Sequence, residues 1–410
     1  MPWLRSLALS LLCSSLAGAA DWPQWLGPNR DGSSPEKVAA WKESPKVLWR
    51  QPAGEGNSGP VVAGGRVFLH AKVKDQDKEQ VDAFDADNGT PIWSAQYDRP
   101  AFKSLYGNGP RATPAISGGH MYTFGITGLL ICWDTATGKE VWRSDTLKQF
   151  HASNLFFGMS CSPLVEANQV LVNVGAKGAS VVALDKDKGT VAWQSQDDRA
   201  SYSSPISFDQ GGARQVVFLT QRGVISLNPT DGSLYWRFPL VDQLLESSTT
   251  PMRSGDVVLA SSITYGSAGL KLQTKDGKPD AMKLWKNDAL TSYFSTPVAV
   301  GPDYTYLVTG SKPPSLSNVA TLHCIETKTG KELWSRPKVG KYHASLLRTG
   351  DDKLLMMEEA GELVLLDPSP KEYRELARSK VSGESWAHPA LANGKLYVRD
   401  AKELICLQLN

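Results

Sequence analysis

A recurrent pair of a small residue and a proline, as in Thr113-Pro114, marks the residues of this sequence that could do chemistry. Three residues before the proline, or before its counterpart in two weaker copies, stand Asn57, Arg111, Ser160, Tyr202, Ser248, Phe294, His343 and Trp386. One residue before it lie hydroxyls and a histidine: Thr113, Ser162, Ser204, Thr250, Thr296, Ser345 and His388. Arg111 is the strongest candidate, because a guanidinium binds carboxylates and other anions.

Two interpretations of these positions are open. If they converge on one opening, their aromatic rings and polar groups would form a ligand pocket. Its predicted ligand-binding residues are Asn57, Arg111, Tyr202, Phe294, His343 and Trp386. Alternatively, the hydroxyls only bond to backbone and water at a crowded entrance.

The spacing of the prolines predicts the elements that would bring these residues together. The seven intervals between Pro60 and Pro389 average about 47 residues, which is typical of propellers, solenoids and arrays. Within one copy, residues 113–144 contain four short apolar runs separated by glycine turns, without helical periodicity. We therefore predict an all-β fold, an eight-bladed β-propeller of four-stranded blades.

The two ends of the chain complete the same ring. The last copy ends after its third strand, and an unassigned strand, Lys46–Arg50, precedes the first copy. Pairing the two would close the propeller and remove both exposed edges. The propeller is thus predicted over residues 46–410, closed by the N-terminal strand. Residues 21–45, with Trp22, Trp25 and Trp41, would latch the closure, or alternatively form a lid over the central channel.

Residues 1–20 have the pattern of a secretory signal peptide, with one arginine, an apolar run and a small-residue end. Cys13 follows two leucines, so we do not expect a lipid-anchored protein but a periplasmic or secreted one. No later apolar run has the roughly 20 residues of a membrane span. The 44 basic and 42 acidic residues are nearly balanced, which argues against a nucleic-acid partner.

The sequence offers no catalytic or metal-binding constellation. Cys132, Cys324 and Cys406 occupy one register in non-adjacent blades, too far apart for disulfides. The six histidines are scattered, without the spacing of a zinc site. The GxGxxG match at residues 54–59 leads into a strand rather than a helix, so we do not interpret it as a dinucleotide site.

A tryptophan follows the glycine turn in most copies, and one stands in the closing strand: Trp49, Trp93, Trp142, Trp193, Trp236, Trp285 and Trp334. The best copy, CWDTATGKEVW at residues 132–142, resembles the repeat of quinoprotein, or pyrroloquinoline quinone (PQQ)-type, propellers. The resemblance spans nearly the whole mature chain. It implies that each tryptophan docks against the turn of a neighbouring blade.

Eight blades without further domains resemble the BamB family of outer-membrane assembly factors. The segments DWPQWLGPNRDG and WAHPALANGKLYVRDAKELICL resemble exported PQQ-like proteins of planctomycete-type bacteria. These resemblances imply a monomeric, non-catalytic scaffold of the cell envelope that binds protein partners and needs no cofactor.

Two alternatives stay open. One is a PQQ-dependent oxidoreductase with a quinone near Arg111 and Trp386 and a calcium ion; the other is a propeller that binds polysaccharide or a small ligand. Against the first, the chain lacks the Cys-Cys pair of quinoprotein dehydrogenases, and no acidic residue stands at the ring positions. The irregular segments 263–283 and 367–376 are expected to be loops that carry specificity.

Overall fold

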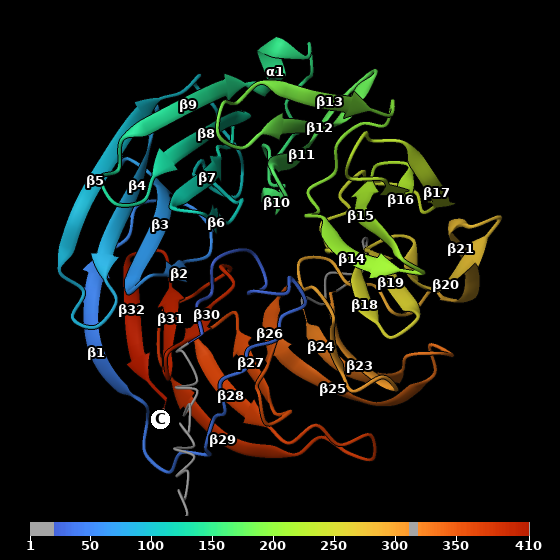
Figure 1. The fold of residues 1–410 in the computed structure, drawn as a ribbon. Coiled ribbons are helices and arrows are strands. Elements are labelled where there is room, and N and C mark those ends of the chain that lie inside the picture. Colours follow the sequence, from blue (N-terminus) through green and yellow to red (C-terminus); the bar gives the residue numbers. More distant parts are fainter. Residues whose placement is uncertain (1–19, 311–318, 410) are drawn as a thin grey trace, which may run out of the picture.

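The computed structural model describes residues 20–310 and 319–409, so the expected signal peptide lies outside the described residues except for Ala20. Eight four-stranded antiparallel sheets surround one axis as the blades of a propeller (Figure 1). The predicted all-β, eight-bladed fold is confirmed. Within the described ranges, the one α-helix is α1, Thr146–Gln149.

The strands follow one another outward from the axis. Blade one has β2 Val61–Ala63, β3 Arg66–Lys72, β4 Lys78–Asp85 and β5 Pro91–Asp98. Blade two has β6 Ala115–Ser117, β7 His120–Phe124, β8 Leu129–Asp134 and β9 Glu140–Asp145. Blade three has β10 Leu164–Glu166, β11 Gln169–Ala176, β12 Ala179–Asp185 and β13 Val191–Ser195. Blade four has β14 Ile206–Gln210, β15 Ala213–Thr220, β16 Gly223–Leu227 and β17 Leu234–Pro239.

The second half of the ring repeats this order. Blade five has β18 Met252–Ser254, β19 Val257–Ser262, β20 Gly266–Lys275 and β21 Lys278–Asn287. Blade six has β22 Val298–Val300, β23 Tyr304–Thr309, β24 Ala320–Glu326 and β25 Glu332–Gly340. Blade seven has β26 Ala344–Arg348, β27 Leu354–Glu358, β28 Glu362–Leu366 and β29 Glu375–Lys380. Blade eight has β30 Ala390–Ala392, β31 Lys395–Arg399, β32 Glu403–Gln408 and, from the N-terminal side, β1 Lys46–Pro52.

The ring closes as predicted. Strand β1 pairs antiparallel with β32, from Lys46 opposite Gln408 to Pro52 opposite Glu403. Figure 1 shows the blue first strand beside the red last one. Strands from the two ends of the sequence therefore share one sheet, and β1 covers the edge that β32 would otherwise expose.

The hydrophobic core lies between blades rather than within one. The middle strands are buried on both faces, as in β8, whose first five residues, LLICW, are all buried. Side chains of neighbouring blades share clusters, for example Tyr122 and Cys132 with Val170 and Val172. The cysteines Cys132, Cys161, Cys324 and Cys406 are free and buried.

Most repeat tryptophans bind the next blade, as the PQQ-type resemblance implies. The indole N–H of Trp142 donates to Lys186 O at 2.9 Å, and a Cβ on Gly189 would lie 2.6 Å from its ring. Only glycine fits there, because its φ of +70° is also left-handed. The same backbone contact to the following blade is made by Trp49, Trp93, Trp193, Trp285 and Trp334.

Blade five departs from the repeat, and the expectation of a loop at 263–283 is wrong. Strands β20 and β21 pair over their whole length, from Ser267 opposite Asn287 to Lys275 opposite Lys278. The residues between are a tight Asp276-Gly277 turn, a strong hairpin signal. Without the usual glycine turn to dock on, Trp236 donates to Gln215 of its own blade.

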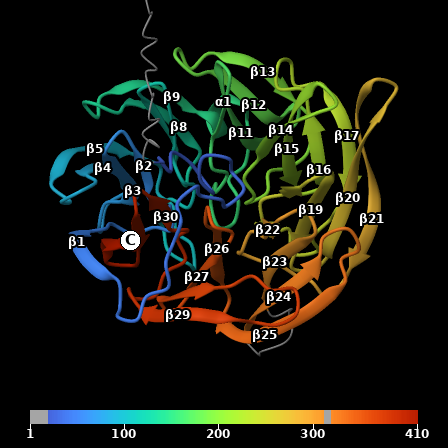
Figure 2. The ribbon, with the colours of Figure 1, turned by 60° about the horizontal axis from the view of Figure 1, so that its bottom comes forward.

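Residues 20–45 lie across the centre of the ring on one face (Figure 2). Trp22 forms an antiparallel bridge with Val62 of blade one, and Ser33 a parallel bridge with Arg348 of blade seven. The buried Arg30 guanidinium donates to carbonyl groups that lead into blades three and four. The segment thus reaches beyond the closure seam, and it forms a floor beneath the opposite mouth of the channel.

Candidate functional site

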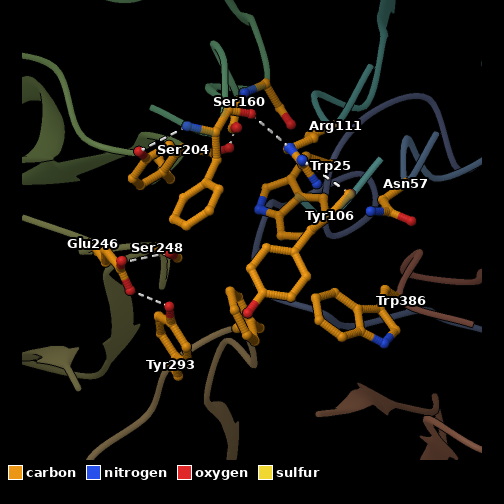
Figure 3. A pocket seen from close by; sticks show the side chains of 14 residues that line it. Trp25, Asn57, Tyr106, Arg111, Ser160, Ser204, Glu246, Ser248, Tyr293 and Trp386 are labelled. Atoms are coloured by element: carbon orange, nitrogen blue, oxygen red, sulfur yellow. Dashed lines mark hydrogen bonds between the residues drawn. The ribbon is translucent and has the colours of Figure 1, made fainter. Parts of the chain in front are cut away.

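A pocket opens at the mouth of the channel, where the chain enters the inner strand of each blade (Figure 3). Its empty volume is about 880 Å³, part of it open to solvent, within the range of small-molecule sites. It is lined by Trp25, Asn57, Tyr106, Arg111, Phe157, Ser160, Ser162, Tyr202, Ser204, Glu246, Ser248, Tyr293, Phe294 and Trp386. Of the six predicted ligand-binding residues, the structure gathers five here, and His343 is the exception.

The residues one position before the proline link neighbouring blades. The backbone N–H of Gly59 donates to Thr113 Oγ1 at 3.0 Å, and that of Thr113 to Ser162 Oγ at 3.0 Å. The N–H of Ser162 donates in turn to Ser204 Oγ at 2.9 Å. These hydroxyls satisfy backbone donors at a crowded entrance, which is the second interpretation of the sequence pattern.

Arg111 is a structural element of the pocket wall. Its Nε donates to Phe157 O at 2.9 Å, and its Nη2 to Tyr106 O at 3.1 Å and Gly107 O at 3.2 Å. With the Asn57 amide oriented so that its oxygen faces the guanidinium, Nη1 donates to it at 3.2 Å. Burial lowers the pKa of Arg111. Carbonyl groups of two entry loops, rather than a free anion, are its partners.

His343 lies behind the wall. Strand β26 already begins at Ala344, so the register that places Arg111 at the mouth leaves His343 against the strand. Its ring nitrogens are 3.1 Å from Ser295 Oγ and 3.0 Å from Ser345 Oγ. Burial lowers its pKa to about 3. The imidazole is therefore neutral and bonded to hydroxyls in the channel wall.

Aromatic rings form most of the pocket surface. Tyr106 lies 5.5 Å from Phe157 and stacks on Trp386 at 6.0 Å, measured between ring centroids. Phe157 is 5.7 Å from Tyr202, and Phe294 is 5.1 Å from Trp386. These separations are those of favourable aromatic pairs. The walls therefore present ring faces and edges to whatever enters.

Glu246 is the acidic member of the lining. Its carboxylate accepts a hydrogen bond from the Tyr293 hydroxyl, and Tyr293 in turn stacks on Phe294. Burial raises the pKa of Glu246, the Tyr293 bond opposes this, and the charge of nearby Asp242 adds to it. In Figure 3 this carboxylate lies at the opposite end of the pocket from Arg111.

Sequence reasoning missed Tyr106, Phe157, Glu246 and Tyr293 as site residues, and assigned Trp25 only to a latch or lid. Tyr106 stands eight residues before Pro114, and Phe157 six before Pro163, so no fixed register identifies them. A weaker signal was available, because aromatic residues cluster in the segments that precede the recurrent prolines. The Trp25 indole N–H donates to Thr250 Oγ1 at 2.9 Å, which holds it as the floor.

The residues present do not fit PQQ with its calcium ion. PQQ carries three carboxylates, whereas the guanidinium of Arg111 is already bonded to backbone carbonyls and Glu246 would repel an anion. Within residues 20–310 and 319–409, no three His, Cys, Asp or Glu side chains are grouped so that they could hold a metal ion. No step through a quinone is derived for this pocket.

The fold and mouth define an eight-bladed propeller of the PQQ-type repeat class. The family model described as outer membrane protein assembly factor BamB matches residues 32–109 and 77–336, well over half of the chain. The chain belongs to this family. It is 23% identical over 305 residues to the outer membrane protein assembly factor BamB of Yersinia pestis, covering 70% of this chain and 71% of that protein.

Solved structures show the same architecture. The quinohemoprotein alcohol dehydrogenase from Comamonas testosteroni superposes with a TM-score of 0.65 at 15% identity, over 95% of this chain and 80% of that one. BamB from Moraxella catarrhalis superposes with a TM-score of 0.61 at 15% identity, over 88% and 99%. At these identities the likeness shows the fold alone. In the part of the chain that the structure describes, no helix is long and apolar enough to span a membrane.

Proposed function

We propose that the protein is a non-catalytic scaffold of the cell envelope that binds a partner protein with the loops around its channel mouth. Membership of the BamB family supports the scaffold role. The observation that carries the docking face is a group of exposed apolar side chains on the loops that line the pocket. Leu105 is 81% exposed, Phe156 71%, Leu245 44% and Leu244 43%. Exposed apolar clusters of this kind mark interaction surfaces.

Site-specific photo-crosslinking in cells that naturally produce the protein tests this docking face. A photoreactive residue is placed at Leu105 or Phe156, and, as a control, at Val141 on outer strand β9, which is 44% exposed. We expect one and the same envelope protein to be joined from both mouth positions and not from Val141. The charged variant Phe156→Asp should weaken the crosslink from position 105. Identical products from all three positions, or none from the mouth, would contradict the proposal.

The quinoprotein alternative is supported by the likeness of fold and by sequence similarity, over less than half of the chain, to quinoprotein alcohol dehydrogenases. A thermal melt separates it from the scaffold. A ligand that binds only the native state stabilises it by about 2.7 kcal/mol at a hundredfold excess over its dissociation constant. We expect no saturable rise in melting temperature with PQQ, with or without Ca²⁺. A saturable rise that disappears in Arg111→Ala would favour a quinoprotein and call for dehydrogenase assays.

A further inference from the structure

The mouth pocket combines aromatic faces with one carboxylate, Glu246, that has no cationic partner among residues 20–310 and 319–409. Among the residues that the structure describes, the groups acting on the Glu246 carboxylate are a tyrosine hydroxyl and a second acid, Asp242. Asp242 is itself buried and accepts only backbone N–H groups, from Leu244 and Thr264. No cation among the described residues therefore neutralises the negative charge at this end of the pocket.

Several hydrogen-bond donors of the lining are already engaged within the protein. The Trp386 indole N–H donates to Glu359 Oε1 at 2.9 Å, and that of Trp25 to Thr250 Oγ1 at 2.9 Å. The Ser160 and Ser248 hydroxyls donate to backbone carbonyls of their own loops. An anion, or a sugar with its many hydroxyls, would therefore find neither indole N–H available. A cation without N–H groups needs none.

We propose that this pocket binds a fully substituted ammonium group, such as the trimethylammonium head of a choline-type molecule. Such a cation is attracted to the faces of Trp, Tyr and Phe within about 6 Å of the ring centroid. Tyr293 and Phe294, whose ring centroids are 3.7 Å apart, would supply those faces, and Glu246 the opposite charge. A primary ammonium fits less well, because its three N–H donors would lose water and find only one carboxylate.

The positive charge of Arg111 does not occupy the position of this cation. Its guanidinium is turned toward the carbonyl groups of Phe157, Tyr106 and Gly107. Figure 3 shows it at the far end of the pocket from Glu246 and Tyr293. The two charges make the pocket bipolar, and the ammonium group belongs at the Glu246 end. The proposal is independent of partner docking, because it concerns the pocket walls and is tested on the purified protein alone.

Isothermal titration with choline chloride tests the proposal. The matched probe is 3,3-dimethylbutan-1-ol, a neutral molecule of nearly the same shape in which carbon replaces the charged nitrogen. We expect saturable choline binding and at least tenfold weaker binding of the alcohol. Equal affinities would show a merely apolar pocket and overturn the proposal, as would the absence of saturable choline binding.

Three variants assign the binding to these side chains. Glu246→Gln keeps the shape of the side chain and a hydrogen-bond acceptor for Tyr293 but removes the charge. It should weaken choline binding at least tenfold without changing the affinity for the alcohol. Phe294→Leu should weaken choline binding similarly. Glu384→Gln removes an exposed charge beside the neighbouring cavity of the same face and should leave the affinity unchanged. An unchanged affinity in Glu246→Gln, with circular dichroism showing a folded protein, would refute the assignment.

Vesicles distinguish the two sources of this head group. If the ligand is a free solute, the protein binds choline but does not sediment with phosphatidylcholine vesicles. If it is a lipid head group, the protein sediments with those vesicles, and Glu246→Gln abolishes the sedimentation. Either result, together with choline binding, supports an ammonium site. Sedimentation that survives Glu246→Gln, without choline binding, would overturn it.

Discussion

Arg30 is predicted to be the side chain on which the central segment depends most. It is 3% exposed, and it donates from Nε to Pro205 O at 2.8 Å and from Nη1 and Nη2 to Pro163 O at 2.8 Å and Ser162 O at 3.1 Å. Its own backbone has a φ of 54°, in the left-handed region that disfavours a residue with a Cβ. The fold tolerates this conformation because the guanidinium joins the entries of two blades.

The expected effect of Arg30→Met follows from these contacts. The three hydrogen bonds from this charged donor to backbone carbonyls contribute roughly 5–9 kcal/mol together. A fourth, from Nη1 to Gln24 Oε1 at 3.2 Å, is only part-buried. Against this, burial lowers the pKa of Arg30 to about 10, which corresponds to a penalty of about 3 kcal/mol for keeping the charge in the fold. Methionine removes both the hydrogen bonds and the penalty for burying the charge, and it leaves three carbonyl groups without a donor. We therefore expect the free energy of unfolding to fall by about 3–5 kcal/mol.

Urea denaturation of the purified protein, followed by circular dichroism, measures the change. The matched control is Arg50→Met, since the Arg50 side chain is 44% exposed and pairs with Glu403 at the surface. An exposed ion pair contributes at most about 1 kcal/mol. The free energy of unfolding of Arg30→Lys should lie between those of Arg30→Met and the wild type, because one ammonium cannot bond the carbonyls of both blades. If Arg30→Met lowered the free energy of unfolding by less than the Arg50→Met control, the Arg30 hydrogen bonds would not stabilise the ring.

Three further predictions concern the repeat and its buried charges. Gly189→Ala should lower the free energy of unfolding by about 2–4 kcal/mol, because the new Cβ would meet Trp142. The control Gly277→Ala has a similar φ but lies in open space, and should lower the free energy of unfolding by only about 1 kcal/mol. Urea denaturation of both variants measures the difference. His343 has a pKa of about 3 in the fold and an ordinary value when unfolded, so the unfolded state binds more protons between these two values. The free energy of unfolding therefore falls as the pH drops from about 6.5 toward 3, by at most about 1.4 kcal/mol per pH unit. In melts between pH 4 and 7.5, the melting temperature of His343→Gln should depend less steeply on pH than that of the wild type. Glu79→Gln replaces a fully buried carboxylate that accepts hydrogen bonds from a tyrosine hydroxyl and a backbone N–H and faces a histidine and an arginine. It should lower the melting temperature, with a loss of about 3 kcal/mol in the free energy of unfolding. A melt indistinguishable from that of the wild type would show that this charge is dispensable.

The fold could be predicted because each blade repeats the same local signals. A glycine turn followed by a tryptophan fixes the third and fourth strands, and the orphan strand with Trp49 has only one place to pair. The extended hairpin of blade five was the exception. Its Asp276-Gly277 turn is a strong hairpin signal, but the search for a repeated glycine-turn pattern concealed it. Residues 20–45 could not be placed, because contacts such as Trp25 with Thr250 join positions 225 residues apart.

The site could be predicted only where it follows the register of the repeat. Counting back from each proline found Asn57, Arg111, Tyr202, Phe294 and Trp386 in one pocket. The same count failed at blade seven, since β26 begins three residues earlier than the register expects. It could not find side chains on entry loops of unequal length, because their positions depend on how each loop folds back over the mouth.

The site residues that follow the repeat and those that depart from it have different physical roles, and the difference bears on function. The equivalent hydroxyls, such as those of Thr113, Ser162 and Ser204, bond to the backbone of the neighbouring blade and so hold the ring together. Groups repeated around an axis produce a symmetric channel, which cannot by itself favour one orientation of an asymmetric ligand. Recognition must therefore come from residues that break the repeat. In this protein those are the floor tryptophan Trp25, which the N-terminal segment supplies, and Glu246, whose charge has no cationic partner among the described residues. A change at either should alter binding while leaving the eight blades intact.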